Sequence, residues 1–452
     1  MMYRKQLALF CCIAALFSYT AGAKQIYVNN GLSAAVDTGP GTSTAPFKTI
    51  GAGIKAAQAG DTVLVSAGTY TEATTASDIS TVGIQIRSKG TAAAPVVIQA
   101  VTPGSVIIDQ KMTAVGFVVL NSSYVTLSGF TIQNCYGGGV RMFEGAPSTG
   151  MVIENMTVNH CDGVPGDNVG GIYIGGCTNC TISNNTISGI TIGGAYNMNA
   201  AGIHGYSQSN CTLSNNVISN AFTGIFHKRS SGQTGLLITN NVISNVTYGI
   251  MYSVGGAGDP PHMNQRVINN IISSSNMAIY APVAEASSTS QGLTIKHNVL
   301  LGAAGIFTWG YDGVVVQDNI FYNLSGDAVG TEKGTWQSEL VTMSNNLFYT
   351  GATFDLQQYG TGAAHYTTLA SFLAATGFGA STNRQLNPLF VNAAGGNYQL
   401  AAGSPGIGAA DDGSNIGAYP TASTVVGLLG SAGSSSPTAQ VAPDPPSNVT
   451  VQ

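Results

Sequence analysis

Charged side chains are scarce in this sequence, and their scarcity excludes several classes of protein. Only 8% of the 452 residues are charged, with 15 Lys+Arg against 20 Asp+Glu and a formal net charge of −5. Without a basic excess, the chain lacks the electrostatic footprint of a nucleic-acid-binding protein. A coiled coil needs abundant Ala, Glu, Lys, Leu and Arg together, and this chain does not have them. Because 44% of the residues are hydrophobic, disorder over most of the chain is excluded as well.

Long apolar runs are absent beyond the first residues, which have the layout of a secretory signal. Arg4 and Lys5 precede an apolar run over residues 7–17, and Ala21-Gly22-Ala23 forms a cleavage site. The run is shorter than the roughly 20 residues that span a bilayer. We therefore expect residues 1–23 to be a signal peptide, and the mature protein to be secreted, extracellular or periplasmic, without a membrane anchor.

Cysteine is sparse too, with five residues left once the signal is removed. They are Cys135, Cys161, Cys177, Cys180 and Cys211. Export makes disulfides possible. The Cys177-x-x-Cys180 pair has no second CxxC motif to complete a metal site.

What the sequence has in abundance is glycine, with 59 residues, and an asparagine phrase that recurs through the chain. The phrase reads Asn-Asn followed by a β-branched residue, as in NNTIS, NNVIS and NNIIS, and it recurs every 21 to 31 residues. Its second Asn falls at Asn185, Asn216, Asn241, Asn270, Asn298, Asn319 and Asn346. One Asn per repeat at one place predicts a ladder of stacked side-chain amides.

A second phrase, Gly or Ala followed by Ile or Val, follows each asparagine phrase, as at Gly202-Ile203 and Gly249-Ile250. Each repeat therefore contains about three short strands separated by polar turns, which is typical of an all-β solenoid. The Leu offsets of leucine-rich repeats are absent, and propeller blades are longer. We predict an all-β, right-handed parallel β-helix.

The repeat alignment places cysteines in two columns, Cys135 with Cys161 and Cys180 with Cys211. Residues of adjacent coils lie about 4.8 Å apart, within the range of a disulfide. Two disulfides or a ladder of buried thiols would both fit this alignment, and Cys177 is left unpaired in either case.

The ends of the chain differ from the repeats. An amphipathic helix near residues 50–58 is expected to cover the N-terminal end of the solenoid, whose open edge would otherwise aggregate. A second short helix is expected near residues 369–375. We predict a β-helix domain over residues 24–420 and a flexible Ser/Gly/Pro-rich tail over residues 421–452.

The two ends carry a resemblance. The segment IYVNNG…GTSTAPFKTIGAGIKAAQAGDTVLVSAGTYTE resembles the opening of secreted bacterial right-handed β-helix proteins, and LNPLFVNAAGGNYQLAAGSPGIGAADDGSNIGAY resembles their closing segment. Polysaccharide lyases of the chondroitinase-B/alginate-lyase and pectate-lyase types share this architecture. The resemblance implies a polysaccharide lyase, with a non-catalytic carbohydrate-binding or cell-surface β-helix as the alternative.

Aligning the coils on the Gly-Ile phrase predicts two outward-facing columns, because alternate residues of a strand face opposite sides. The first is Arg141, Tyr173, His204, Phe226, Met251, Tyr280 and Phe307. The second is Phe143, Gly175, Tyr206, Lys228, Ser253, Pro282 and Trp309. Aromatic faces stack on sugars and cations pair with acidic groups. Arg141, Tyr173, Tyr280 and Trp309 are therefore candidates for binding an acidic polysaccharide, unless loops cover the column and make it a second small core.

The densest cluster of chemically active residues is His204, Tyr206, His227, Lys228 and Arg229. Elimination from a uronate needs a base at C5, a proton donor for the leaving oxygen and a positive group at the carboxylate. The segment GIFHKRSSG resembles the Lys-Ser-Ser segment of the chondroitinase-B/alginate-lyase family, which implies Lys228 as base. Arg229 or His227 would then neutralise the carboxylate, and Tyr206 or His204 would be the acid. The family's Arg-His-Gly of the following coil is replaced here by MYSVGG.

Carboxylates are few near this cluster. Glu144, Asp162 and Asp167 lie in loops of the preceding coils, and loop oxygens suit calcium, so calcium is a possible cofactor. Inverting hydrolysis needs convergent carboxylates, and the two aligned columns contain none. Asp411 and Asp412 fall in the closing segment, where a structural role is expected. The protein is expected to act as a monomer on an acidic polysaccharide.

Overall fold

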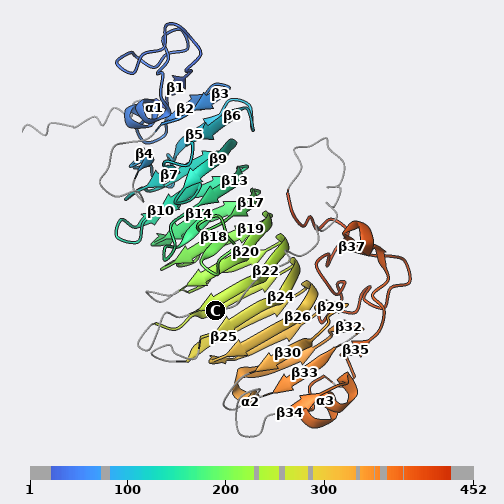
Figure 1. Cartoon of the computed structure of the whole chain (residues 1–452). Coiled ribbons are helices and arrows are strands. Elements are labelled where there is room, and N and C mark those ends of the chain that lie inside the picture. Colours follow the sequence, from blue (N-terminus) through green and yellow to red (C-terminus); the bar gives the residue numbers. More distant parts are fainter. Residues whose placement is uncertain are drawn as a thin grey trace, which may run out of the picture.

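Short strands stacked coil upon coil make up most of the molecule (Figure 1). The structure is a computed structural model, and it describes residues 22–72, 82–228, 234–253, 260–283, 289–331, 336–350, 352–356, 364–379 and 381–428. Almost every strand pairs in parallel with the equivalent strand of the next coil. The predicted parallel β-helix is therefore confirmed. Residues 1–21 of the predicted signal peptide lie outside the described residues.

Three faces form the wall of the β-helix. The first face comprises β1 (Gln25–Val28), β2 (Thr62–Val65), β5 (Val96–Ala100), β8 (Val125–Ser128), β12 (Val152–Glu154), β16 (Thr181–Ser183), β19 (Thr212–Ser214), β21 (Leu237–Thr239), β23 (Met263–Ile268), β25 (Ser290–Lys296), β28 (Val314–Gln317) and β31 (Leu340–Ser344). The second face comprises β3 (Gly68–Tyr70), β6 (Val106–Asp109), β9 (Phe130–Tyr136), β13 (Thr157–Asp162), β17 (Thr186–Ile190), β29 (Ile320–Tyr322), β32 (Leu347–Tyr349) and β35 (Arg384–Gln385). The third face comprises β4 (Gly83–Ile86), β7 (Val115–Val119), β10 (Val140–Met142), β14 (Val169–Gly175), β18 (Ala200–Tyr206), β30 (Asp327–Thr331) and β33 (Thr353–Leu356), with β34 (Ala364–Tyr366) antiparallel at its end.

In the middle coils the second and third faces are continuous, because single long strands run through both. These strands are β20 (Val217–Lys228), β22 (Val242–Ser253), β24 (Ile271–Pro282) and β26 (Val299–Trp309). Smaller pairings join β11 (Ser148–Thr149) to β15 (Cys177–Thr178), β27 (Tyr311–Asp312) to β25, and β36 (Phe390–Asn392) to β37 (Asn397–Leu400). A buried core of Ile, Val, Leu and Phe fills the space between the faces.

The predicted asparagine ladder is confirmed at the corner between the first and second faces. Each amide nitrogen donates to the amide oxygen of the next coil, at 2.9 Å from Asn241 to Asn270 and 3.0 Å from Asn270 to Asn298. The ladder runs from Asn185 and continues one rung past the predicted set, to Asn383. The residue before each ladder Asn from Asn185 to Asn346 has a positive φ, 60° at Asn269, which turns the chain at the corner. Asn adopts this conformation more readily than most residues, which explains why the phrase begins with Asn in most repeats.

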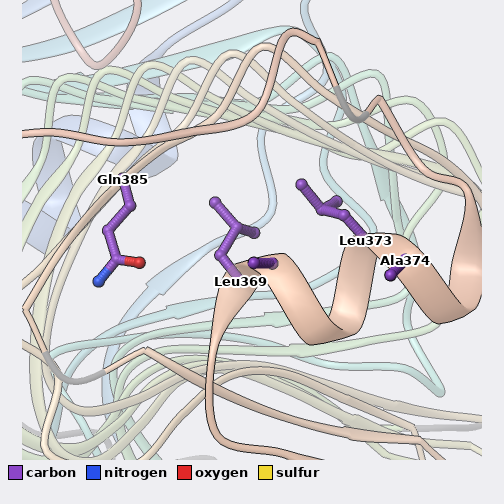
Figure 2. A pocket seen from close by; sticks show the side chains of 5 residues that line it. Leu369, Leu373, Ala374 and Gln385 are labelled. Atoms are coloured by element: carbon purple, nitrogen blue, oxygen red, sulfur yellow. The ribbon is translucent and has the colours of Figure 1, made fainter.

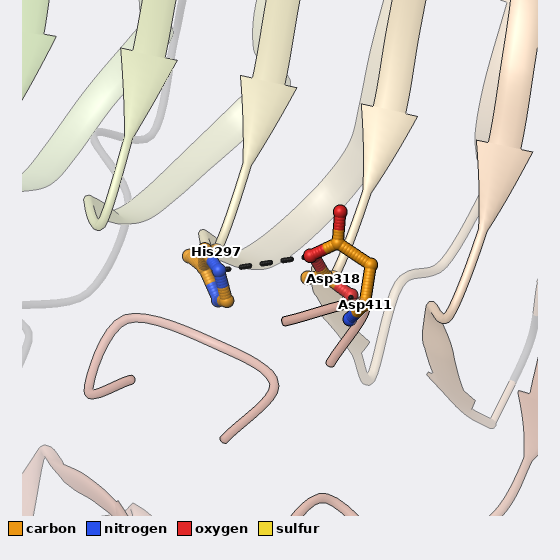
Figure 3. A group of neighbouring side chains, drawn as sticks. All are labelled: His297, Asp318 and Asp411. Carbon is orange, nitrogen blue, oxygen red and sulfur yellow. Dashed lines mark hydrogen bonds and ion pairs between the residues drawn. The ribbon is translucent and has the colours of Figure 1, made fainter. Parts of the chain in front are cut away.

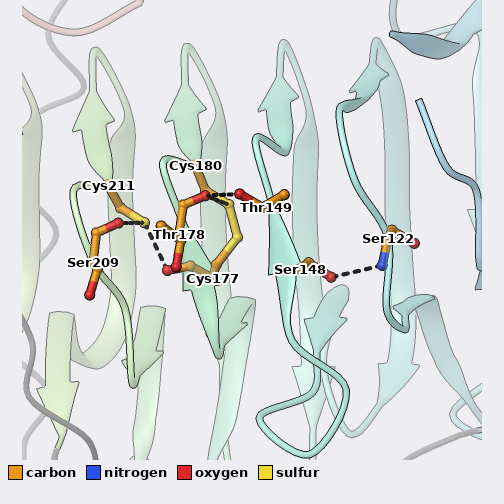
Figure 4. The surroundings of a disulfide bond; sticks show 8 residues. All are labelled: Ser122, Ser148, Thr149, Cys177, Thr178, Cys180, Ser209 and Cys211. Atoms are coloured by element: carbon orange, nitrogen blue, oxygen red, sulfur yellow. Dashed lines mark hydrogen bonds between the residues drawn. A yellow bond between two sulfur atoms is a disulfide. The ribbon is translucent and has the colours of Figure 1, made fainter. Parts of the chain in front are cut away.

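The cysteine columns stack as predicted, but the disulfide joins a different pair (Figure 4). Cys161 lies in register with Cys135, and both are buried free thiols, as is Cys211. The disulfide links Cys177 to Cys180 across 6.2 Å between their Cα atoms. The expectation that Cys177 is unpaired is therefore wrong: β15 ends at Thr178, and the short turn to Cys180 brings both side chains inward.

Both ends of the β-helix are covered. At the N-terminal end, α1 (Ile50–Ala56) buries Ile50 and Ile54 against the first strands, as predicted, and the Glu72 carboxylate accepts hydrogen bonds from the Ile50 and Gly51 amides. At the other end lie α2 (Trp336–Glu339) and α3 (Leu369–Thr376), the second of which confirms the predicted short helix. Thr368 caps its first turn and Gly377 ends it in the left-handed conformation.

The C-terminal segment folds back along the second face, where Figure 1 shows it beside the later coils. It contains β36, the short 3-10 helix η2 (Ala393–Gly395) and β37. Ile416 and Val426 bury themselves against Ile271 and Val299 of that face. The Gly427 amide donates to the Asn240 carbonyl at 2.8 Å. Val426 and Gly427, which belong to the predicted flexible tail, are thus buried against the β-helix, whereas residues 421–423 are exposed. Residues 429–452 lie outside the described part.

Within the part of the chain that the structure describes, no helix combines the length and hydropathy needed to cross a membrane.

Candidate functional site

The strand register of the third face confirms the two predicted columns. In the first column the paired residues are Arg141, Tyr173, His204, Phe226, Met251, Tyr280 and Phe307. In the second column, Gly175 pairs with Tyr206, Lys228 with Ser253, and Pro282 with Trp309. The residues between the columns alternate with them and point to the inner side of the wall, where Met142, Ile174, Tyr252 and Ala281 belong to the buried core.

The first column is much more buried than an exposed binding stripe would be. His204 has no exposed surface, and Arg141, Tyr173, Phe226, Met251 and Phe307 are all less than one tenth exposed. Phe226 and Met251 form a small cluster with Ala201, against which Tyr248 and Tyr280 pack. The column is therefore largely a second small core on the outer side of the wall, and the open surface of this face lies along the second column.

Arg141 is committed to contacts within the protein. One guanidinium nitrogen donates to the backbone oxygens of Gly137 and Asn168, at 3.1 and 3.3 Å. The other lies 3.5 Å from the Asp167 carboxylate. The guanidinium stands 4.7 Å from the ring centroid of Tyr173. These contacts fix Arg141 and Tyr173 in place, with little of either side chain left to meet a ligand.

His204 lies within a stack of aromatic rings. Its ring is 5.4 Å from that of Tyr206, with only 7° between the planes, 5.4 Å from Tyr173 and 4.9 Å from Phe226. Burial, and then the nearby charge of Lys228, lower the pKa of His204 to about 3. The imidazole is therefore neutral at neutral pH. Of the two predicted acids, Tyr206 is the one that is partly exposed.

Lys228 ends β20 on the outer side, at the level of this stack. Its ammonium donates to the side-chain oxygens of Asn199 and Asn168, at 3.0 and 3.3 Å, and stands 5.8 Å from the Phe226 ring. Burial lowers the pKa of Lys228. Burial favours the neutral form of the amine relative to an exposed lysine, as a general base requires, and the two amide oxygens orient the amine.

His227 faces the opposite side, and its predicted role at a substrate carboxylate is wrong. Neighbouring residues of a strand point to opposite faces, so the outward direction of Lys228 turns His227 into the core, where it has no exposed surface. Its Nδ1 lies 2.6 Å from the Gln208 amide nitrogen. Burial lowers the pKa of His227 well below its ordinary value. Arg229, the other predicted neutralising group, lies outside the described residues.

His227 belongs to a group of polar side chains inside the β-helix. Its ring lies 5.4 Å from that of Tyr252, which in turn lies 5.7 Å from His262 and 6.3 Å from Tyr311. All four side chains are at most 1% exposed. This interior group was not anticipated from the sequence, because no repeat phrase marks it.

The three carboxylates predicted to bind calcium do not form one of the groups of described residues whose potential ligand atoms all lie within 4.8 Å of one another. Glu144 accepts a hydrogen bond from the Ser207 hydroxyl at 2.5 Å, and Asp162 accepts one from Thr191 at 3.0 Å. Asp167 pairs with Arg141. Each carboxylate has its own protein partner, and the set does not fit a shared calcium ion.

Tyr280 and Trp309 lie further along the third face. Tyr280 is partly exposed, and its ring stacks 5.1 Å from Tyr248 and 5.6 Å from Phe307. Trp309 is partly exposed at the end of β26, in the second column with Lys228. Of the predicted sugar-binding residues, these two retain surface for a ligand.

Two clusters of potential metal ligands occur among the described residues, both outside the predicted site. The first is His297, Asp318 and Asp411 (Figure 3). Lys296 occupies this cluster, with its ammonium 3.3 Å from Asp318 and 2.6 Å from Asp411. Burial and the neighbouring Asp411 raise the pKa of Asp318 to about 6. The cluster ties the C-terminal segment to the second face, which agrees with the structural role expected of Asp411.

The second cluster is Asp327, Asp355 and His365. Asp355 continues the first outward column, because Phe307 pairs with Gly330 and Gly330 with Asp355. The absence of carboxylates from that column therefore holds only as far as Phe307. The asparagine phrases could have carried the alignment two coils further and found Asp355, but His365 comes from the antiparallel β34, which no repeat phrase predicts.

A shallow pocket of about 420 Å³ lies far along the chain, between α3 and β35. Figure 2 shows its lining of Leu369, Leu373, Ala374 and Gln385. The lining is almost wholly apolar and offers no group for acid–base or nucleophilic chemistry. The residues of the predicted site are on other elements.

Family models match two stretches of the chain. Residues 27–185 match the model described as "Pel9A-like, right handed beta helix region", and residues 201–371 match the model "Right handed beta helix region". No curated protein matches the sequence.

Solved structures resemble the whole fold at low sequence identity. A crystal structure of pectate lyase Pel9A matches with a TM-score of 0.51 and 16% identity, over 88% of this chain and 96% of that chain. A mannuronic acid specific polysaccharide family 6 lyase from human gut microbiota matches with a TM-score of 0.50 and 14% identity, over 75% of this chain and 77% of that chain. At these identities the likeness establishes the fold.

Proposed function

Because the chain belongs to the right-handed parallel β-helix proteins, we propose that it is a secreted polysaccharide lyase that cleaves a uronate-containing polysaccharide by β-elimination at Lys228. The observation that carries the proposal is the setting of Lys228: its amine is on the outer side of the third face, held by two amide oxygens, with a pKa lowered by burial. The fold that it shares with two lyases supports the same reaction class.

In the proposed reaction, the neutral amine of Lys228 removes the proton from C5 of a uronate. The C4–O4 bond then breaks, a C4–C5 double bond forms, and the leaving oxygen receives a proton. Tyr206 is the proposed donor, because its ring stacks on His204 one coil before Lys228 and remains partly exposed. We assign the neutralisation of the uronate carboxylate to Arg229, which follows Lys228 directly in the sequence.

Tyr280 and Trp309 are proposed to bind the polymer beyond the reacting sugar. Trp309 lies three coils from Lys228 in the second column, roughly 14 Å at the spacing of parallel strands. Tyr280 and Trp309 lie on adjacent strands and are partly exposed, so they suit sugars that lie further along an extended chain than the reacting one. Glu144, Asp162 and Asp167 do not gather around one ion, so no step of the reaction is assigned to calcium.

The test is the ultraviolet absorbance of the unsaturated uronate formed by elimination. The mature protein is incubated with alginate, polygalacturonate, chondroitin sulfate, dermatan sulfate, heparan sulfate and hyaluronan, with and without calcium. We expect absorbance to rise on one polymer, to be lost in Lys228→Ala, and to be kept in Lys89→Ala, which removes an exposed lysine elsewhere. A rise that survives Lys228→Ala would leave a lyase with a different base.

The second candidate is a non-catalytic carbohydrate-binding β-helix. It is favoured by the burial of Arg141, Tyr173 and His204, which removes two of the four predicted sugar-binding residues and one of the two predicted acids from contact with a ligand. A flat absorbance trace on every polymer, together with binding that Lys228→Ala weakens only slightly, would select this candidate.

A further inference from the structure

The third face ends in a group of side chains that the proposed elimination does not use. Asp327 of β30, Asp355 of β33 and His365 of β34 each offer one ligand atom, and these atoms lie within 4.8 Å of one another. The antiparallel pairing of β33 with β34 puts His365 directly opposite Asp355. Three strands of one sheet therefore hold the three ligand atoms, which makes the arrangement more rigid than one built on loops.

The group has both support and access. The Thr353 hydroxyl donates to Asp327 at 2.6 Å, and the His365 imidazole contacts the Asp355 carboxylate. The Asp355 side chain is 16% exposed and that of His365 is 54% exposed. The hydrogen bond from Thr353 thus orients the Asp327 carboxylate, while the side of the group towards His365 is open to solvent.

The cluster of His297, Asp318 and Asp411 differs from this group because it contains a lysine. His297, Asp318 and Asp411 have the same residue types, and Lys296 places a positive charge between the two carboxylates. Among the described residues, the ion-pair partner of Asp355 is His365 itself, and no Lys or Arg pairs with Asp327 or Asp355. Two adjacent carboxylates repel each other unless they share a proton or a cation lies between them.

We propose that Asp327, Asp355 and His365 bind a divalent transition-metal ion, in the position that Lys296 takes in the other cluster. Two carboxylate oxygens and one imidazole nitrogen suit Zn²⁺ or Mn²⁺, whereas Ca²⁺ prefers oxygen ligands alone. Three protein ligands leave a coordination position open towards solvent. This site is five coils from that of Phe226 and Lys228, roughly 24 Å at the spacing of parallel strands.

Two carboxylates as close as these do not form the acid–base pair of a glycosidase. Retaining and inverting enzymes hold their carboxyl groups roughly 5 to 9.5 Å apart, to leave room for the sugar or a water molecule. One oxygen of the Asp327 carboxylate lies within 4.8 Å of one oxygen of the Asp355 carboxylate. The geometry therefore favours a shared ion over a hydrolytic pair.

The test is isothermal titration of the full chain, stripped with a chelator, with ZnCl₂. We expect one Zn²⁺ bound at this site, with affinity reduced about 10-fold or more in His365→Ala and in Asp355→Asn. Thr353→Val, which removes only the support of Asp327, should reduce the affinity by about 10-fold, the lower end of the range for such partners of metal ligands. His160→Ala is the matched control, because His160 is also exposed but contacts an asparagine, and it should bind Zn²⁺ as the wild type does.

Melting curves of the metal-free proteins establish that each variant is folded. Equal Zn²⁺ affinity in the wild type, His365→Ala and Asp355→Asn would overturn the proposal, as would no binding at all. Binding of CaCl₂ that exceeds that of ZnCl₂ and survives His365→Ala would also overturn it. Because Lys228 is five coils away, elimination measured on metal-free protein reports on the proposed lyase site separately.

Discussion

His227 and Lys228 are consecutive residues of β20, yet they belong to different environments. Lys228 ends the strand on the outer side, where neutral amides hold its ammonium. His227 lies inside the core among Gln208, Tyr252 and His262, with a neutral imidazole. The inner side of the wall determines stability and the outer side determines reactivity, so mutations on the two sides should separate the two properties.

Among the substitutions that should separate the outer side from the inner side, the largest effect is expected at Tyr206, on the outer side. Tyr206→Phe keeps the ring stacked on His204 but removes the proposed proton donor, so the rate of elimination should fall by roughly 10²- to 10⁴-fold with an unchanged melting temperature. Rates of unsaturated product formation give the readout. Tyr196→Phe, on an exposed tyrosine, is the control. An unchanged rate in Tyr206→Phe would remove Tyr206 from the reaction.

The next effect is expected inside, at the asparagine ladder. Asn270→Leu removes the acceptor of the Asn241 backbone and side-chain amides and the donor to Asn298. Leaving these buried groups unpaired should lower the free energy of unfolding by about 3 kcal/mol, as measured by chemical denaturation. Asn276→Leu, where the amide is exposed and donates only to the Tyr248 hydroxyl, should change it by less than about 1 kcal/mol. Equal losses would contradict a special role for the ladder.

Acid should destabilise the fold through histidines that are buried on both sides of the wall. Burial lowers the pKa of His204 to about 3 and of His262 to about 4, and it lowers that of His227 well below its ordinary value. Below pH about 6.5 the histidines of the unfolded chain bind protons, whereas the buried rings of the folded chain do not. The free energy of unfolding therefore falls as pH decreases towards 4. Each ring contributes up to about 1.4 kcal/mol per pH unit.

Denaturation at a series of pH values measures this loss. His204→Phe should reduce the slope of the free energy of unfolding against pH by the contribution of one histidine. Lys89→Ala, on the surface, should leave this slope unchanged. A protein that becomes more stable between pH 6.5 and pH 4 would contradict the neutral state of the buried histidines.

The smallest effect is expected at the outer aromatic side chains. Tyr280→Ala removes a partly exposed ring stacked on Tyr248 and Phe307, and it should weaken binding of the cleaved polymer several-fold, about 1 kcal/mol. The binding constant from titration with a short oligosaccharide checks this. Tyr196→Ala serves as the control, and equal affinities in the two variants would exclude Tyr280 from the binding surface.

The repeats explain why the fold was predictable from the sequence. Asn269 and Asn270 illustrate how one phrase forms a corner: Asn269 adopts the positive φ of the turn, and Asn270 joins the ladder of amides. Apolar residues between the corners bury the second Asn of each phrase, and its amide then finds its hydrogen-bond partner in the neighbouring coil. Register followed from the same phrases, which is why both outward columns were placed correctly.

The site was predictable only in part, because register does not determine exposure. Arg141 and His204 point outward as predicted, but loops and neighbouring rings bury them. The prediction for His227 rests on its position beside Lys228 in the sequence. Alternate residues of a strand face opposite sides, so His227 points inward from β20. The Cys177–Cys180 disulfide and the His365 side chain depend on local turns and an antiparallel strand, which lie outside the repeat.

The measurement that tests the central claim most directly is the rate of unsaturated uronate formation by Lys228→Ala and His227→Asn, each compared with the wild type on the polymer that the wild type cleaves. We predict that Lys228→Ala loses roughly 10²- to 10⁴-fold in rate while it melts like the wild type. His227→Asn should melt at a lower temperature but keep its rate at temperatures where it is folded. A fully active Lys228→Ala protein, or a folded His227→Asn protein without activity, would contradict the assignment of chemistry to the outer side of β20.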